Sequence, residues 1–255
     1  EGDPAYAADY PHLAYHAEEG RDQAAVLRYA VAAARDAAAF GAHREAAAQY
    51  GRALRFAQGL PDPEVAELLE ARSYECYLTG QIQDAIAERE RAVTLRDAAG
   101  DRLKAGDNLR WLSRFCWFAG RNAAAEEHAR AALTLLEALP PGRELAMAYS
   151  NLSQLRMLAM DATDAMHWGT RAIELATELG DQAILAHALT NVGTVLATAD
   201  DPAGRRMIER SIEIARAHGL DDDVTRGYAN LAWASLDRYD LNAAEEIIET
   251  ALAYT

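Results

Sequence analysis

The stretch Gly80-Gln81-Ile82-Gln83-Asp84-Ala85, which runs on through Arg89 to Ala92 and Val93, decides the fold because its pattern occurs six times along the chain. Every copy ends on a small residue followed by an apolar or small one. That small residue is Ala53, Ala92, Ala132, Ala172, Ser211 or Ala251, so the copies are spaced by 39, 40, 40, 39 and 40 residues. A fixed period of this length indicates a repeat architecture.

Each copy is preceded by a second helical pattern, as in Leu109-x-x-Leu112-Ser113 and Tyr149-x-x-Leu152-Ser153. Apolar and small residues at this spacing form one helix face that packs on its neighbours. The arrangement resembles the tetratricopeptide repeat, and we predict an all-α fold, a right-handed α-solenoid of about six tetratricopeptide-like helix-turn-helix repeats. We place a capping helix within residues 1–21 and one continuous solenoid over 22–255, with repeats at 22–60, 61–100, 101–141, 142–181, 182–220 and 221–255.

Composition supports this prediction and narrows the function. The 255 residues include 58 alanines and 7 valines, which favours helix over strand. A net charge of −15 disfavours binding to a phosphate backbone, so we expect no direct contact with nucleic acid. No run is long and apolar enough for a membrane span, and we expect no membrane partner. Two cysteines without a leader sequence suggest a reducing compartment, and we predict the cytoplasm.

The residues for catalysis are missing from this sequence. Lys104 is the only lysine and lies outside any Gly-x-x-x-x-Gly-Lys pattern, so the chain cannot hold nucleotide in a Walker A loop. His12 and His16 are one helical turn apart but have no third ligand for a metal. No nucleophile motif is present. We therefore predict that the chain is not an enzyme and that it carries no cofactor and no metal.

Three asparagines recur at one register of the first helices: Asn151, Asn191 and Asn230. If the first helices line the concave groove of the solenoid, this ladder of amides can pair with a peptide backbone, since each amide both donates and accepts hydrogen bonds. The alternative is that the three asparagines cap or bridge neighbouring helices. Both interpretations are open at the level of the sequence.

Other polar and aromatic side chains fall near that ladder, and we add them to the predicted ligand-binding groove: Tyr74, Tyr77, Arg110, Trp111, Arg114, Trp117, Gln154, Thr194 and Trp233. Exposed aromatic residues would suit an apolar or aromatic ligand. Arg110 and Arg114, one helical turn apart, could hold a carboxylate. The alternative for each residue is packing within the solenoid, with the arginines paired to acids such as Glu70 or Asp107.

Several phrases carry a second resemblance: Arg72-Ser73-Tyr74-Glu75-Cys76-Tyr77-Leu78-Thr79-Gly80, Arg110-Trp111-Leu112-Ser113-Arg114 and Glu144-Leu145-Ala146-Met147-Ala148-Tyr149-Ser150-Asn151-Leu152. They are similar to the repeat region of large actinobacterial LuxR-family regulators, the MalT-like signal-transduction ATPases. The resemblance implies a piece of a longer chain, with an ATPase module before the repeats and a DNA-binding module after them.

The resemblance also implies a function for the repeats. We expect a non-catalytic sensor domain of a transcriptional regulator, which binds a peptide, a small effector or a protein partner in its concave groove. The alternative is a constitutive scaffold for protein–protein interaction or oligomerisation. The sequence does not identify the ligand or the partner.

Overall fold

The computed structural model describes residues 9–254, which form thirteen α-helices and no strand within that range. In chain order the helices are α1 (Tyr10–Glu19), α2 (Gln23–Ala39), α3 (His43–Arg55), α4 (Asp62–Leu78), α5 (Ile82–Ala98), α6 (Arg102–Phe118), α7 (Asn122–Leu136), α8 (Arg143–Leu158), α9 (Ala162–Leu179), α10 (Gln182–Thr198), α11 (Pro202–Ala217), α12 (Asp221–Asp237) and α13 (Leu241–Leu252). None of the helices in the described range is long and apolar enough to cross a membrane.

The helices after α1 form six pairs, α2–α3 to α12–α13, and each pair lies within one of the predicted repeat ranges. The all-α prediction and the α-solenoid fold class are confirmed. The recurrent small residues explain the pairing: the side chains of Ala53, Ala92, Ala132, Ala172 and Ser211 are completely buried. Each lies on the second helix of its pair, where a larger side chain would push the helices apart.

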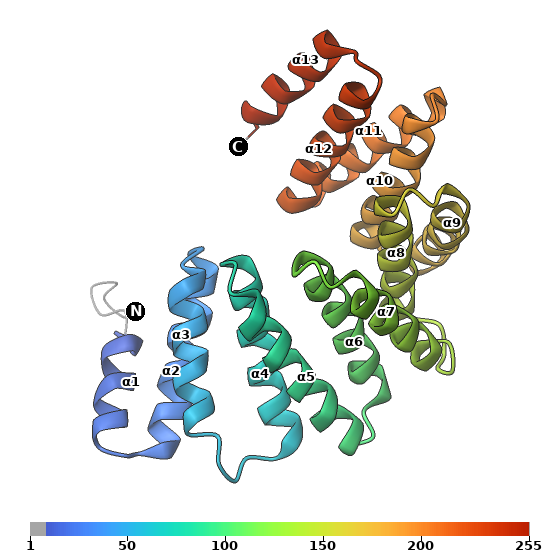
Figure 1. Ribbon diagram of the computed structural model, residues 1–255. Helices are drawn as coiled ribbons and strands as arrows, with labels where there is room; N and C mark the ends of the chain where they lie inside the picture. The colour runs from blue at the N-terminus through green and yellow to red at the C-terminus, as the bar shows by residue number, and fades with distance from the viewer. Residues whose placement is uncertain (1–8, 255) are drawn as a thin grey trace. The chain divides into compact units, whose positions relative to one another are not determined.

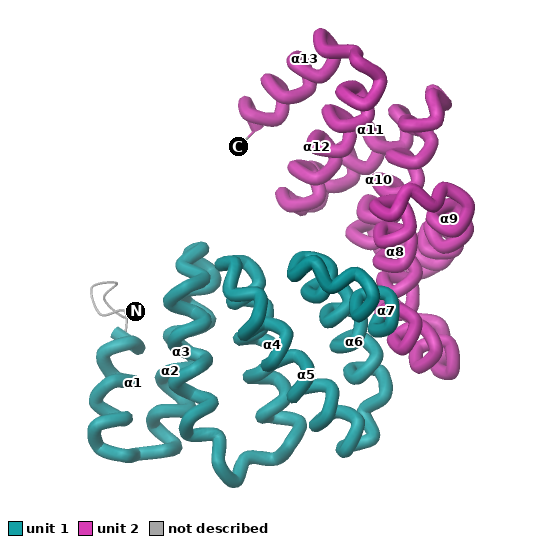
Figure 2. The backbone as a smooth tube through the Cα atoms, in the orientation of Figure 1, with its two compact units in different colours: residues 1–128 teal, residues 129–255 magenta. Residues whose placement is uncertain are grey.

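The chain divides into two compact units (Figure 2). Unit 1 comprises residues 1–128 and unit 2 comprises residues 129–255. The boundary falls inside α7 because the second half of that helix packs forward along the chain. Ala129, Leu133 and Leu136 of α7 join Leu145 and Ala148 of α8 in a hydrophobic cluster of unit 2.

Within each unit, helices that follow one another in the chain pack against one another. In unit 1 this holds from α1 to α6 (Figure 1). In unit 2, α10 is the central helix, since it contacts α8, α9, α11 and α12. Most side chains of α10 are buried, in keeping with that position. The closest approach is that of α10 to α11, at Gly193 and Gly204.

The turn between the two helices of a pair requires one residue with a left-handed backbone. Unit 1 uses glycine at this register, with Gly80 at φ 75° and Gly120 at φ 72° as examples. Unit 2 uses Met160 (φ 60°), Asp200 (φ 60°) and Tyr239 (φ 58°) instead. The backbone of a residue other than glycine is strained in this conformation. The turns of unit 2 are therefore less favourable than those of unit 1.

Replacing Met160 by glycine is expected to raise the free energy of unfolding of unit 2 by about 1 kcal/mol, since relief of strain exceeds the added entropy of the unfolded chain. Met160 is largely exposed, so little packing is lost. The reverse change, Gly120→Ala, should lower stability by about 1 kcal/mol through backbone strain alone, because an added Cβ meets no atom within 4 Å. Urea unfolding measures the free energy of unfolding of both variants. If both substitutions change it in the same direction, backbone strain does not explain the difference between the turns.

Candidate ligand-binding surfaces

Aromatic side chains from α4 and α6 meet in unit 1. Tyr74 and Tyr77 lie on α4, and Trp111, Phe115 and Phe118 lie on α6. The ring centroids of Tyr77 and Phe115 are 5.1 Å apart, those of Tyr74 and Trp111 are 5.4 Å apart, and those of Tyr77 and Phe118 are 5.2 Å apart. These spacings are within the range of favourable aromatic contacts. We call these five residues the aromatic cluster.

Two arginines of α6 lie on the aromatic cluster. Nε of Arg114 donates a hydrogen bond of 3.0 Å to the hydroxyl of Tyr77, and its guanidinium lies 5.6 Å from the ring centroids of Tyr77 and Phe118. The Arg110 guanidinium lies 4.4 Å from the centroid of Trp111. Such cation–π contacts hold the arginine side chains over the rings. Arginine side chains therefore border the aromatic cluster.

The two arginines differ in how deeply they are buried. Arg110 is buried, and its guanidinium bonds the Asp107 carboxylate at 2.8 and 2.9 Å. This pairing is the packing alternative that the sequence left open for Arg110. Arg114 is only half-buried, as are Tyr74, Tyr77, Trp111 and Trp117. Trp117 borders the cluster, with its ring centroid 5.0 Å from that of Phe118. The half-buried residues keep part of their side-chain surface exposed, whereas Arg110 is buried and paired with Asp107.

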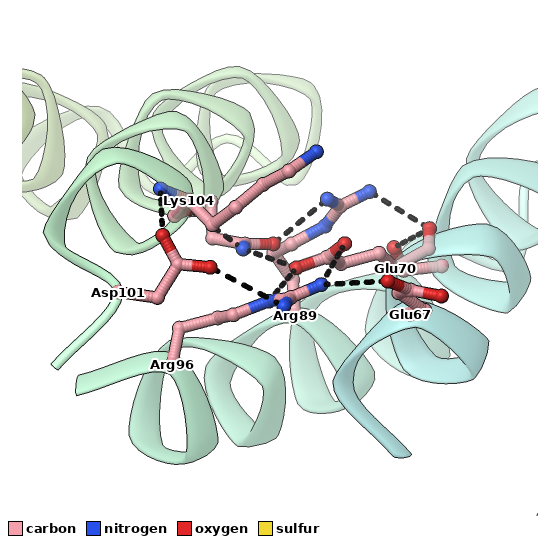
Figure 3. Close-up of polar contacts among 8 residues, drawn as sticks. Glu67, Glu70, Arg89, Arg96, Asp101 and Lys104 are labelled. Atoms are coloured by element: carbon pink, nitrogen blue, oxygen red, sulfur yellow. Dashed lines mark hydrogen bonds and ion pairs between the residues drawn. The ribbon is translucent and has the colours of Figure 1, made fainter. Parts of the chain in front are cut away.

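Beneath the aromatic cluster lies a buried polar network that the sequence analysis missed (Figure 3). The guanidinium of Arg89, on α5, lies 5.6 Å from the ring centroids of both Trp111 and Phe115. Arg89 donates to Oδ1 of Asn108 at 2.8 Å and to the backbone oxygen of Glu70 at 2.9 Å. Burial lowers the pKa of Arg89 to about 10. The buried, positively charged guanidinium of Arg89 therefore lies next to the rings of the aromatic cluster.

Glu70 is the centre of this network. Its carboxylate accepts two hydrogen bonds from Arg96, at 2.9 and 3.0 Å, and one from the Asn108 amide at 2.7 Å. Arg96 is almost completely buried, and the hydrogen bond with Glu70 raises its pKa. Figure 3 shows Arg96 and Arg89 converging on Glu70 from the same helix. The network ties α4, α5 and α6 together below the aromatic cluster.

A second polar network runs between the first helices of unit 2. The Asn191 amide nitrogen, on α10, donates to the backbone oxygen of Ser150 on α8 at 2.9 Å. The amide oxygen of Asn191 accepts from Arg226 on α12 at 2.9 Å. The Ser150 hydroxyl lies 2.7 Å from Nδ1 of His187. Asn191 is completely buried, so its contacts are those of a side chain that bridges neighbouring helices.

The other predicted groove residues of unit 2 vary in exposure. Asn151 and Thr194 are buried, and Asn230 and Gln154 are half-buried. The Asn230 amide donates to the backbone oxygen of Arg226 at 2.8 Å, and its oxygen lies 3.2 Å from the Thr194 hydroxyl. Trp233 is 42% exposed on α12. The structure thus brings Asn191, Asn230 and Thr194 into one network with Arg226, and it leaves Trp233 at the surface.

Replacing Asn191 by alanine is expected to lower the free energy of unfolding by about 1–3 kcal/mol, because buried hydrogen-bonding groups of Ser150 and Arg226 lose their partner. Urea unfolding followed by circular dichroism measures the loss. Asn230→Ala is the matched control at the next register, where the side chain is half-buried. An Asn191 variant as stable as the original chain would show that the amide does not stabilise the packing of α8, α10 and α12.

Known proteins share the fold of this chain. No protein-family model and no curated protein matches the sequence. Among solved structures, the apo form of RapI has a TM-score of 0.77 at 8% identity and covers 96% of this chain and 97% of its own. The Rap conjugation gene regulator of plasmid pLS20, in complex with the Phr* peptide, has a TM-score of 0.72 at 16% identity. That match covers 93% of this chain and 65% of the regulator.

TPR-like repeats provide another match. Those of a kinesin light chain of Podosopora anserina have a TM-score of 0.59 at 13% identity, over 76% of this chain and 96% of theirs. Identities this low establish a common fold only. This chain therefore has the architecture of TPR-like helical-repeat proteins.

Proposed function

We propose that this chain is a non-catalytic repeat domain that binds a peptide segment over the aromatic cluster of unit 1. The observation that carries the proposal is the group of half-buried aromatic residues on α4 and α6, bordered by Arg114 and Trp117. Aromatic and arginine side chains are the residue types that anchor protein and peptide ligands most strongly. A Rap regulator with the same fold has been solved in complex with a peptide, which supports this class of ligand.

The chemistry of the surface defines the peptide. Tyr74, Tyr77, Trp111 and Trp117 offer apolar area with a hydroxyl or indole N–H at its edge, which suits an aromatic or aliphatic anchor. Arg114 places a positively charged guanidinium beside the rings of Tyr77 and Phe118, and this charge attracts a ligand carboxylate. The Glu70 network below holds α4 and α6 together, so the surface is formed before the ligand arrives. We infer a ligand with an apolar side chain close to an acidic group.

A displayed library of random peptides tests this proposal, followed by affinity measurements on the enriched sequences. We expect Arg114→Gln and Trp117→Leu each to weaken binding at least about ten-fold, the effect of removing an interface anchor. Arg91→Gln and Trp168→Leu are matched controls, because Arg91 is an exposed arginine of α5 and Trp168 is a half-buried tryptophan of α9. Failure to enrich any peptide, or equal losses in the control variants, would contradict the proposal.

The proposal extends to the parent protein. We infer that the repeats form the sensor of a LuxR-type regulator in the cytoplasm, with an ATPase module before them and a DNA-binding module after them. The two buried, unpaired cysteines, Cys76 and Cys116, suit a reducing compartment. The coding DNA on either side of Glu1 and Thr255 tests this extension. A Walker A loop upstream and a helix-turn-helix downstream are expected, and an open reading frame that lacks both would contradict it.

A constitutive scaffold is the second candidate function. It is favoured by apolar side chains that α12 and α13 leave exposed, namely Trp233, Leu236, Leu241, Ile248 and Leu252. Burial of these side chains against a second copy of the chain would stabilise a dimer, since removing apolar area from water is favourable. Sedimentation distinguishes the two candidates. Dimers at low micromolar concentration favour the scaffold, and a monomer favours the peptide-binding domain.

A further inference from the structure

Unit 2 contains a pocket of about 490 Å³ between the last two helix pairs. It lies beside the turn that joins α10 to α11 and beside the C-terminal end of α12, and all its lining residues belong to unit 2. A volume between roughly 300 and 1,000 Å³ is typical of sites for small molecules. None of the residues of the aromatic cluster takes part, so this pocket is separate from the proposed peptide surface.

The pocket combines an apolar wall with a balanced set of charges. The apolar wall is formed by the side chains of Ala197, Leu231 and Ala234. Each of these residues is largely buried. Six charged residues surround them, three acidic and three basic: Asp200, Asp201, Asp240, Arg205, Arg206 and Arg238. Charges of both signs next to apolar area can pair with both charged groups of a zwitterion that has an apolar body.

The arginines of the pocket are engaged to different degrees. Arg238 pairs with Asp200 at 2.9 Å, and Arg205 pairs with Glu209 at 2.8 Å. Arg206 is exposed and has no hydrogen-bond or ion-pair partner in residues 9–254. A guanidinium without a protein partner can donate two parallel hydrogen bonds to a ligand carboxylate. Arg206 is therefore the side chain best placed to hold the anionic group.

In Asp201 and Asp240, one carboxylate oxygen accepts a hydrogen bond from the backbone and the other is left for a ligand. Oδ1 of Asp201 accepts from the backbone N–H of Ala203 at 2.8 Å, and Oδ1 of Asp240 accepts from that of Ala243 at 3.2 Å. These bonds cap the first turns of α11 and α13 and fix both carboxylates in place. The second oxygen of each can accept a hydrogen bond from a ligand ammonium group, as an ionised carboxylate has several acceptor sites.

Asp200 lies in the turn at the edge of the pocket. Asp200 holds a left-handed conformation at the register where the turns of unit 1 use glycine. Its carboxylate pairs with Arg238, which directly follows the end of α12 and also lines the pocket. A glycine would relieve the strain but would remove this ion pair.

We propose that this pocket binds a small zwitterion with an apolar body, either a free apolar amino acid or a dipeptide. Arg206 holds the carboxylate, Asp201 or Asp240 accepts hydrogen bonds from the ammonium group, and the apolar side chain lies against Leu231 and Ala234. The two sources share one chemistry, a free carboxylate and a free ammonium group on an apolar molecule.

Thermal melting of the whole chain with the apolar L-amino acids and their dipeptides, each at millimolar concentration, tests the proposal. Binding to the folded state raises the melting temperature as ligand concentration passes the dissociation constant. We expect at least one compound to do so, and the two arms of the panel distinguish free amino acid from dipeptide. If no compound in either arm raises the melting temperature, the proposal is overturned.

Variants and analogues of the best compound then locate the site. Arg206→Gln should weaken calorimetric binding at least about ten-fold, and it should fold normally because Arg206 is exposed. Arg210→Gln, an exposed arginine one turn further along α11 and outside the pocket, should bind like the original chain. Analogues that lack the ammonium or the carboxylate group should each bind about ten-fold more weakly. Equal binding by Arg206→Gln, or full affinity of either analogue, would overturn the proposal whatever the outcome for the peptide surface.

Discussion

Replacing Glu70 by glutamine is expected to lower the free energy of unfolding of unit 1 by about 3 kcal/mol, at the lower end of the range for a broken buried ion pair. The change leaves the almost fully buried guanidinium of Arg96 without its two-bond partner. Asp101 remains 3.4 Å from Arg96 and offsets part of the loss. Urea unfolding followed by circular dichroism measures the difference.

Glu67→Gln is a matched control for Glu70→Gln. Glu67 lies on the same helix and pairs with the same arginine, but at 4.0 Å and with its side chain 72% exposed. An exposed pair of this kind contributes less than about 1 kcal/mol. If the two variants unfold at the same urea concentration, the buried network does not stabilise α4, α5 and α6. A double-mutant cycle of Glu70 with Arg96 would give the coupling energy directly.

Replacing Gly204 by alanine is expected to lower the stability of unit 2 by about 2–3 kcal/mol, despite the higher helix propensity of alanine. The added Cβ would lie 2.2 Å from the backbone nitrogen of Ala197 and 2.5 Å from the backbone oxygen of Gly193. Both neighbours are backbone atoms of α10, so the whole of α11 must move away. Thermal and urea unfolding should both show the loss.

Gly51→Ala provides the control for this substitution, since Gly51 also lies inside a helix. Its added Cβ would approach only the Arg72 side chain, with the nearest atom, Nε, at 3.1 Å. The Arg72 side chain bonds Glu88 and the backbone oxygen of Ala47, but a contact of 3.1 Å needs a shift of only a few tenths of an ångström, so we expect a change within about 1 kcal/mol. A Gly204→Ala chain as stable as Gly51→Ala would show that α10 and α11 are not held as closely as the structure has them.

The repeat fold could be predicted from the sequence because each repeat places one small residue at the same buried position between its two helices. Ala53, Ala92, Ala132, Ala172 and Ser211 are spaced regularly and are completely buried between paired helices. Gly100, Gly180 and Gly219 follow the ends of α5, α9 and α11 and have left-handed backbones. The same periodicity gave no sign that the chain divides into two units, because that division depends on how the second half of α7 packs.

The sites were harder to predict, because they depend on which polar side chains meet. Glu70 and Asn108 are 38 residues apart, and no local pattern predicts that Arg89 and Arg96 converge on them. The register argument placed Asn191 correctly on a first helix but could not show that its amide is used by Ser150 and Arg226. Tyr74, Tyr77, Trp111 and Arg114 were selected by the same argument, and the structure brings them together.

Fluorine NMR of the chain labelled with fluorotryptophan, titrated with an enriched peptide, tests the central claim most directly. The four tryptophans, Trp111, Trp117, Trp168 and Trp233, give one resonance each and can be assigned by single substitutions to phenylalanine. The proposal predicts that the resonances of Trp111 and Trp117 shift with bound peptide while that of Trp168, on α9, stays in place. Shifts confined to Trp168 or Trp233, with Trp111 and Trp117 unchanged at saturation, would contradict peptide binding at the aromatic cluster.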